Sequence, residues 1–310
     1  MVIHKRVGKL MQEINLKHSV IFFNFCILLC SINQFLSNPI IVCLFLILIL
    51  GVSHGALDNI KGRKILKIYN FENIIIFYSL YLAISIFIIS SWLLFPDITL
   101  LLFLIVASYH FGKEDTVNQI NEKFLYEEFL LFLKGSPIII APLFFHRDET
   151  YEIFNILNFN VFKSSFFNDF NLFIFLFLSL ISNIIIMKKG DTDFKLIILI
   201  DYLSIIILNV FLKPVLAFTL YFCFLHSIRH AIGLCFNLDD NFQNGLKKFI
   251  KKAIPLTLIT AILFLTAIYS LNNFYDLNEA IYKVIFIGLA SLTFPHILLE
   301  YLIERNEKRH

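Results

Sequence analysis

Long apolar stretches alternate with short polar ones along the whole chain, and this pattern predicts helices that cross a membrane. A helix needs about 20 apolar residues to span a bilayer, although neighbouring helices allow shorter ones. Ten segments approach this length: 18–36, 38–57, 72–94, 97–113, 124–145, 170–187, 194–211, 214–236, 250–271 and 279–303. The fourth is short, so eight or nine full spans with re-entrant pieces would also fit. We expect an all-α, polytopic integral membrane helix bundle of about 8–10 transmembrane helices.

The distribution of Lys and Arg among the polar segments predicts the orientation of the chain. If ten spans start from an N-terminus inside, the inner segments hold twenty of the 26 Lys and Arg, and the outer loops hold three. Such a bias is typical of cytoplasmic loops. We expect one transmembrane domain over 1–310 with both termini cytoplasmic, namely a basic arm at 1–17 and a short tail at 304–310. The first apolar segment lacks an A-x-A-like cleavage site and further spans follow directly, so it predicts a retained span.

The composition excludes several classes of protein. The chain is 58% hydrophobic and only 16% charged, whereas a soluble domain has about a quarter charged residues. The net charge of +3 lies in loops and gives no reason to expect nucleic-acid binding. The five cysteines show no CxxC spacing, which argues against a disulfide framework or a zinc ribbon.

Five of the nine histidines lie inside predicted spans, where an ionisable side chain is costly and usually functional. They are His54 in GVSHGALD, His110 in SYHFGKED, His226 and His230 in FLHSIRHA, and His296 in FPHILLEY. All five lie past the middle of spans that run inwards, so we expect their rings at one depth in the cytoplasmic half of the bilayer. A single intramembrane histidine is more often a hydrogen-bond partner between helices. Five at one depth predict a metal site, and imidazole ligands favour iron, copper or zinc.

Each of these motifs carries a second polar group four residues later, on the same helix face. Asp58, Glu114 and Glu300 are therefore candidates to orient a ring, although a partner from another helix would serve equally. Asp58 and Glu114 have a simpler interpretation as caps at the membrane boundary. Arg229 lies close to the His226 face, and Tyr109 is either an interfacial anchor or a site residue.

The motifs HGALD, YHFGKED, HSIRHA and FPH, in this order between residues 51 and 301, resemble those of the Brp/Blh family of membrane β-carotene 15,15′-dioxygenases. The resemblance implies an Fe(2+) enzyme that splits the central double bond of β-carotene with O2 and releases two retinal molecules. It places the iron-binding histidines at His54, His110, His226 and His230, and gives His296 an orienting or pocket role. It further implies the cell membrane of a bacterium or archaeon, and an opsin as a natural consumer of retinal.

Other functions remain open at this stage. Membrane di-iron desaturases carry eight or more histidines in HxxxH and HxxHH boxes, and this chain has one HxxxH and five intramembrane histidines. A bis-histidine haem protein would use histidines on facing helices, with Arg229 near a propionate. A transporter or a carotenoid-binding protein would use the histidines without cleaving anything. An enzyme acting on another carotenoid would have the same motifs.

Overall fold

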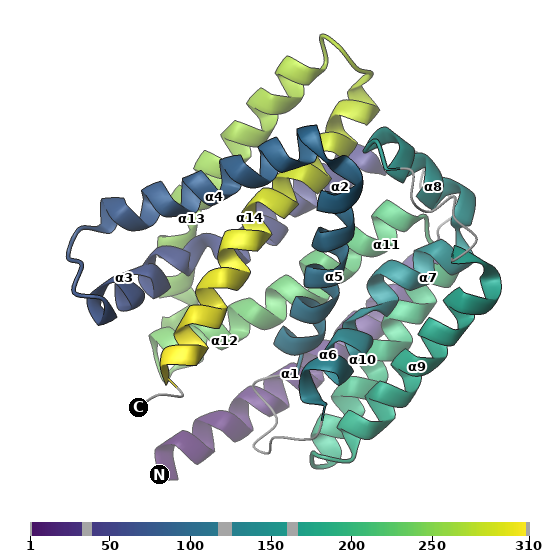
Figure 1. Ribbon diagram of the computed structural model, residues 1–310. Coiled ribbons are helices and arrows are strands. Elements are labelled where there is room, and N and C mark those ends of the chain that lie inside the picture. Colours follow the sequence, from purple (N-terminus) through teal and green to yellow (C-terminus); the bar gives the residue numbers. More distant parts are fainter. Residues whose placement is uncertain (1, 33–38, 117–125, 160–166, 308–310) are drawn as a thin grey trace.

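The computed structural model describes residues 2–32, 39–116, 126–159 and 167–307, and these ranges form helices joined by short loops. The first half comprises α1 (Val2–Ser31), α2 (Ile40–Leu46), η2 (Ile47–Gly51), η3 (Val52–Leu57), α3 (Asp58–Ile68), α4 (Ile74–Leu94), α5 (Pro96–Glu114), α6 (Glu127–Gly135), α7 (Pro137–Phe145) and α8 (Arg147–Ile156). The second half comprises α9 (Asp169–Met187), α10 (Thr192–Phe211), α11 (Pro214–Leu220), η7 (Tyr221–Ser227), α12 (Ile228–Leu238), α13 (Phe242–Leu271) and α14 (Leu277–Glu307). No strand occurs in these ranges, which confirms the predicted all-α bundle (Figure 1).

Among the described residues, nine helical segments are long and apolar enough to cross a membrane. They cover every predicted span except the short fourth one. That span is α5, which carries Asp97, Lys113 and Glu114 at its ends. With 19 residues, α5 is roughly 28 Å long, close to the thickness of the hydrocarbon core. The chain is therefore a polytopic membrane protein.

Several element boundaries differ from the predicted ones for local reasons. The described part of the predicted basic arm, from Val2 onwards, forms part of α1, and the predicted loop at 58–71 contains α3. The predicted span 124–145 is two helices, α6 and α7, because Pro137 lacks an N–H and begins a new helix after Ser136. The amphipathic helix α8 follows where only a loop was expected.

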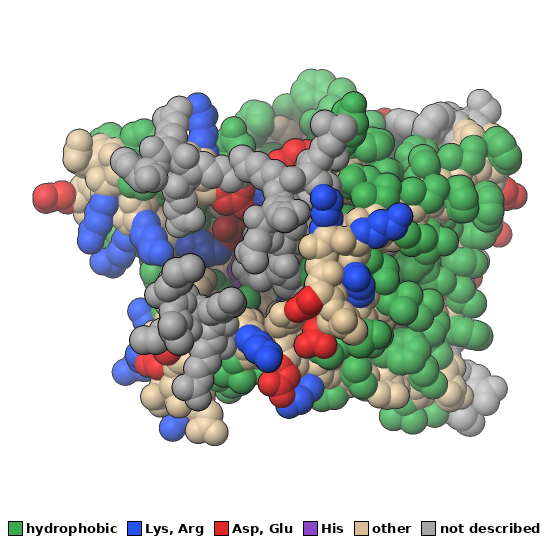
Figure 2. All heavy atoms as spheres, turned by 90° about the horizontal axis from the view of Figure 1, so that it is seen from below, with side chains coloured by type: hydrophobic (Ala, Val, Ile, Leu, Met, Phe, Trp, Pro, Cys, Tyr) green, Lys and Arg blue, Asp and Glu red, His purple; other side chains and the backbone are tan. Residues whose placement is uncertain are grey.

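The start of α1 and the end of α14 lie at the same end of the bundle (Figure 1). Figure 2 looks onto this end and shows many Lys and Arg side chains there, while hydrophobic side chains cover one flank. Gln12 on α1 donates to Asp191, just before α10, over 2.5 Å, so the α9–α10 loop lies at this end too. This arrangement agrees with the predicted placement of both termini on one side.

Candidate metal centre

Four of the five intramembrane histidines lie together in the interior of the bundle. The ring centroids of His110 and His226 are 5.3 Å apart, those of His110 and His296 are 5.4 Å apart, and those of His230 and His296 are 5.8 Å apart. His110, His226 and His296 are buried, and the side chain of His230 is only 8% exposed. The backbone of His54 belongs to η3, but its side chain lies outside the described part of the structure. Helices α5, α12 and α14, with η7, thus bring distant histidines to one place.

The backbone departs from α-helical geometry at two of the histidine motifs. His226 lies in the π-helix η7, which continues directly into α12 and His230. The π-helix η2 and the 3-10 helix η3 precede Asp58, and η3 contains His54. Such short π and 3-10 segments inside longer helices often mark functional sites, because they re-aim side chains at the cost of regular hydrogen bonds.

A carboxylate from another helix engages the Nδ1 atom of three of the rings. His226 Nδ1 is 3.1 Å from Asp115, His230 Nδ1 is 2.9 Å from Glu114, and His296 Nδ1 is 2.9 Å from both oxygens of Asp58. A ring that donates its Nδ1–H to a carboxylate carries its lone pair on Nε2, which is the form that binds a metal ion. The three contacts therefore suit these rings for metal binding.

These pairings join carboxylates and rings from different helices, which is one of the two arrangements that the four-residue spacing left open. Asp58 contacts His296 on α14, and Glu114 contacts His230 on α12, while the side chain of His54 lies outside the described part of the structure. Residues four apart share a helix face, but an imidazole that points into the bundle reaches sideways to the adjacent helix. The spacing thus identified Asp58 and Glu114 as candidate partners, and the contacts follow the alternative in which the ring comes from another helix.

The other predicted site residues lie at the margin of the cluster. One donor atom each from Glu300, His230 and His296 lies within 4.8 Å of the others, and Glu300 also forms an ion pair with Lys61. The hydroxyl of Tyr109 donates to Glu128 on α6, which makes it a contact between helices.

Arg229 is buried and forms an ion pair with Asp201 on α10. Its Nη2 also donates to Ser19 on α1 over 2.7 Å. Arg229 therefore connects α1, α10 and α12.

Sequence reasoning missed Asp115 and two tyrosines that hold the carboxylates. Tyr221 donates to Asp115 over 2.7 Å, and Tyr81 donates to Asp58 over 3.1 Å. A histidine, a carboxylate and a tyrosine are thus connected by hydrogen bonds in two places, His226–Asp115–Tyr221 and His296–Asp58–Tyr81. The adjacent acidic pair in HFGKED was a signal for Asp115, since the two histidines of HSIRH need two acceptors.

Buried aromatic rings lie against one member of the cluster, His226. The ring of Phe111 lies edge-on to His226 with centroids 4.8 Å apart, and the ring of Phe222 stacks on His226 at 5.9 Å. Phe222 in turn packs against Gly51 so closely that a Cβ at this glycine would lie 2.6 Å from the phenyl ring. These contacts keep bulk water away from His226.

The donor set fits a metal ion such as iron. Two imidazoles bound to one ion at about 2.1 Å have ring centroids roughly 4.6–6 Å apart, and the three centroid distances lie in this range. The donors are neutral nitrogens without thiolates, a set that suits iron, copper or zinc rather than magnesium or calcium.

Comparison with known proteins identifies the family of the chain. No solved structure matches the chain. The chain is similar to a protein of an uncultured marine bacterium, 66A03, named β-carotene 15,15′-dioxygenase, with 28% identity over 276 residues that cover 86% of this chain and 94% of the relative. The sequence pattern of the family described as β-carotene 15,15′-dioxygenase matches residues 45–304, which include all five intramembrane histidines. The chain belongs to the β-carotene 15,15′-dioxygenase family and is a carotenoid dioxygenase.

Proposed function

We propose that this chain is an iron-dependent enzyme that cleaves β-carotene at its 15,15′ double bond with O2 and releases two molecules of all-trans-retinal. The observation that carries the proposal is the buried group of imidazoles, three of them held at Nδ1 by carboxylates. The similarity to a relative named for this reaction supports the choice of substrate. The host membrane would be the cell membrane of a bacterium or archaeon, and an opsin would be a natural acceptor of the product.

His54, His110, His226 and His230 would hold the ion, and the geometry adds His296 as a fifth candidate. Ferrous iron, when bound, would supply the electron transfer that allows O2 to react with a carbon–carbon double bond. Asp115, Glu114 and Asp58 fix the tautomer and the direction of three rings. Each of the two carbons of the cleaved bond receives one oxygen atom, so the atoms of substrate and O2 balance in two aldehydes.

The surroundings of the rings suit a lipid-dissolved hydrocarbon. Phe111 and Phe222 lie against His226 and present apolar surface next to the proposed ion. β-Carotene needs no charged anchor and is roughly as long as the hydrocarbon core is thick. The protein would therefore position the polyene by shape and keep water from the reacting carbons.

The geometry favours this function over a haem protein. The histidine rings lie edge-on to one another, at interplanar angles of 69°, 89° and 76°. A bis-histidine haem needs an open, flat slot between its two ligand rings, whereas the rings of this cluster contact one another edge to face. A purified protein without a Soret band agrees with the non-haem centre, and a strong Soret band contradicts it.

The first test is expression in a bacterium that accumulates β-carotene. We expect loss of the orange colour, retinal in the extract and about one iron per purified chain. The variant His230→Ala should insert normally but lose iron and retinal formation, while His146→Ala, at the end of α7 and outside the cluster, should retain both. A wild-type protein that binds iron and leaves β-carotene intact would refute the substrate, and a His230→Ala variant with full iron would refute the ligand assignment.

A further inference from the structure

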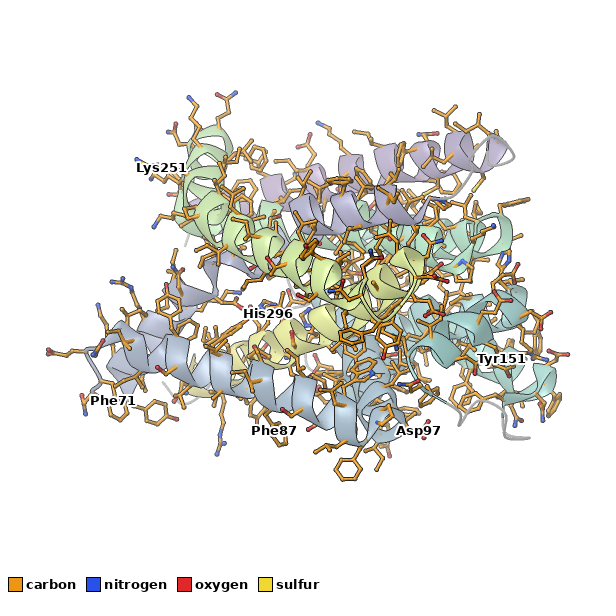
Figure 3. The ribbon with its side chains drawn as sticks, turned by 90° about the horizontal axis from the view of Figure 1, so that it is seen from above. Phe71, Phe87, Asp97, Tyr151, Lys251 and His296 are labelled. Carbon is orange, nitrogen blue, oxygen red and sulfur yellow. The ribbon has the colours of Figure 1, made fainter. Side chains whose placement is uncertain are left out.

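Helix α1 packs against the π-helix η7, which forms one side of the metal centre. The rings of Phe25 on α1 and Phe224 in η7 have centroids 5.3 Å apart. Figure 3 shows α1 (purple) and α4, along which Phe87 lies, on opposite flanks of the bundle, with His296 between them. Because α1 lies outside residues 45–304, the sequence pattern of the family does not include it.

One backbone carbonyl of η7 does not have its α-helical partner. In an α-helix, the N–H of Ile228 would bond to the carbonyl of Phe224, four residues earlier. The N–H of Ile228 bonds instead to the carbonyl of Leu225. A carbonyl oxygen has two lone pairs, so this change leaves the oxygen of Phe224 able to accept a hydrogen bond from outside its own helix.

A side chain of α1 supplies such a hydrogen bond. His18 Nε2 lies 2.7 Å from the carbonyl oxygen of Phe224. A carbonyl can only accept, so Nε2 carries the hydrogen and donates it. The other ring nitrogen, Nδ1, is buried and has no hydrogen-bond partner among the described residues. Within the described chain, the polar contact of this ring is therefore the one with the main chain of η7.

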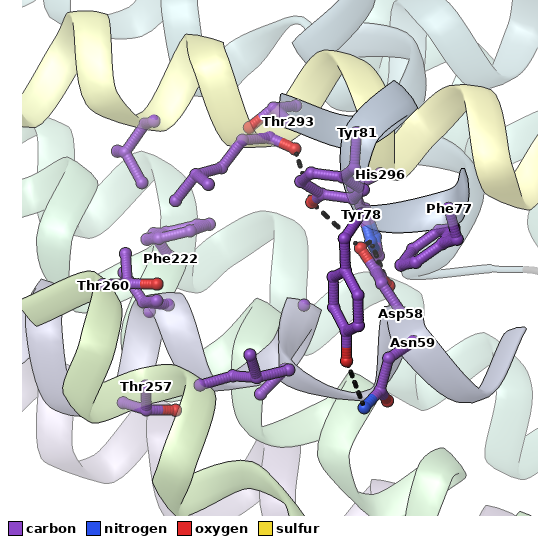
Figure 4. Close-up of a pocket in the computed structure, with 17 residues that line it drawn as sticks. Asp58, Asn59, Phe77, Tyr78, Tyr81, Phe222, Thr257, Thr260, Thr293 and His296 are labelled. Carbon is purple, nitrogen blue, oxygen red and sulfur yellow. Dashed lines mark hydrogen bonds and ion pairs between the residues drawn. The ribbon is translucent and has the colours of Figure 1, made fainter. Parts of the chain in front are cut away.

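The geometry of η7 determines which of its side chains reach the metal centre. His226 follows Phe224 by two residues and belongs to the cluster of rings. Phe222 precedes Phe224 by two residues and lines a cavity of about 130 Å³ that Asp58 and His296 also line (Figure 4). If this segment returned to α-helical geometry, its side chains would point in other directions. A contact that holds the π-helix thus also holds the direction of His226.

We propose that His18 is a positioning residue for the metal centre. Its Nε2–H holds the carbonyl of Phe224 and thereby keeps η7 in the form that directs His226 at the ion. Asp115 fixes the ring of His226 at Nδ1, and His18 fixes the backbone that carries this ring, so the two contacts act on one ligand from different sides. The inference rests on the proposed function, and it adds α1 to the helices on which the centre depends.

The test compares His18→Met with His18→Gln. The two new side chains have nearly the same length, but only that of Gln offers an N–H to the carbonyl of Phe224. Binding of Co(II) to the purified full-length protein is followed by the visible absorption band of the ion, which reports its coordination geometry. We expect His18→Met to weaken Co(II) binding roughly 5-fold, as for the loss of one hydrogen bond, and to change the band. His18→Gln should retain the affinity and the band of the wild type.

Asn24→Leu is the matched control on α1, because the amide of Asn24 donates to the carbonyl of Val20 on the same helix. It should leave Co(II) binding unchanged. The melting temperatures of the metal-free proteins are measured alongside. A His18→Met protein that melts earlier but keeps the wild-type affinity and band would show that His18 only stabilises the bundle, and would overturn the inference.

Equal losses of Co(II) affinity in His18→Met and His18→Gln would also overturn it, because the hydrogen bond would then not be the cause. The band is read per bound ion, so a low yield of one variant does not affect the comparison. Metal binding is measured without carotenoid. A wild-type chain that binds neither Co(II) nor iron refutes the proposed function itself, whereas a metal-binding wild type with unaffected variants refutes the role of His18 alone.

Discussion

At the scale of single residues, the centre depends on contacts between helices. Asp115, Glu114 and Asp58 each hold a histidine that lies more than 100 positions away in the sequence. Two of these carboxylates are held in turn by tyrosine hydroxyls. A ligand whose ring is fixed before the metal arrives loses less freedom on binding, so these acceptors should contribute to metal affinity without touching the ion.

The first residue-scale prediction concerns Asp115. Asp115→Asn keeps the size of the side chain but removes the charge that orients His226, and it should weaken iron binding about 10- to 100-fold. Glu114→Gln and Asp58→Asn should act similarly through His230 and His296. Iron content after dialysis against a graded chelator measures this effect. Glu304→Gln is the control, since Glu304 pairs with Lys113 outside the cluster. An Asp115→Asn protein with wild-type iron affinity would show that this contact does not contribute to iron binding.

A second prediction at this scale concerns the buried ion pair of Arg229 and Asp201. Arg229→Met leaves Asp201 buried and unpaired, and should lower the free energy of unfolding by about 3–5 kcal/mol. The double variant Arg229→Met/Asp201→Leu removes both charges and should recover most of the loss. Thermal unfolding in detergent compares the three proteins. A double variant as unstable as the single one would show that the pair stabilises the bundle beyond its own charges.

At the scale of elements, the approach of α6 to α5 positions one side of the centre. A Cβ on Gly112 would lie 1.8 Å from the carbonyl oxygen of Leu131, and one on Gly135 would lie 2.0 Å from that of Ser108. The helices thus cross with their backbones in contact, as small residues allow in membranes. Gly112 lies between His110 and Glu114, so the crossing fixes the end of α5 that carries the site.

Gly112→Ala should therefore separate α5 from α6. We expect a fall in melting temperature and a loss of iron, because backbone atoms cannot move aside as a flexible side chain can. Gly8→Ala is the matched control, since a Cβ at Gly8 meets nothing within 4 Å. The ratio of folded protein to aggregate after heating measures stability, and the iron content per chain measures the loss of iron. A Gly112→Ala protein as stable and iron-loaded as Gly8→Ala would mean that this crossing can relax.

The sequence predicted the helices well and their interruptions poorly, for a physical reason. A long apolar run predicts a transmembrane helix because the bilayer core requires apolar side chains over that length. The depth of a residue in the bilayer then follows from its position along the run. The break at Ser136–Pro137 and the π segment at His226 depend on packing against other helices, which periodicity does not contain. For the same reason the depth of the histidines was foreseeable, whereas the partner of Asp58 was not.

At the scale of the whole molecule, the number of crossings determines where the termini lie. If α5 crosses the membrane together with the nine clearly apolar helical segments of the described chain, the chain makes ten crossings. An even number returns the chain to the side on which it began, and Figure 1 shows α1 starting and α14 ending at one end. The cluster of histidines depends on this count, because α5, α12 and α14 must all bring their rings to the same depth.

Cysteine labelling tests the count and the orientation together. Lys189→Cys lies in the exposed α9–α10 loop at the end where α1 starts, and Asn273→Cys lies in the exposed α13–α14 loop. An impermeant maleimide applied to intact cells should label the cysteine at 273 and spare the one at 189 until the membrane is opened, because the basic loops stay inside. Four of the five native cysteines are buried, which keeps the background low. Labelling of both positions from outside would contradict the even number of crossings. Labelling of position 189 alone would place the metal centre in the outer half of the bilayer.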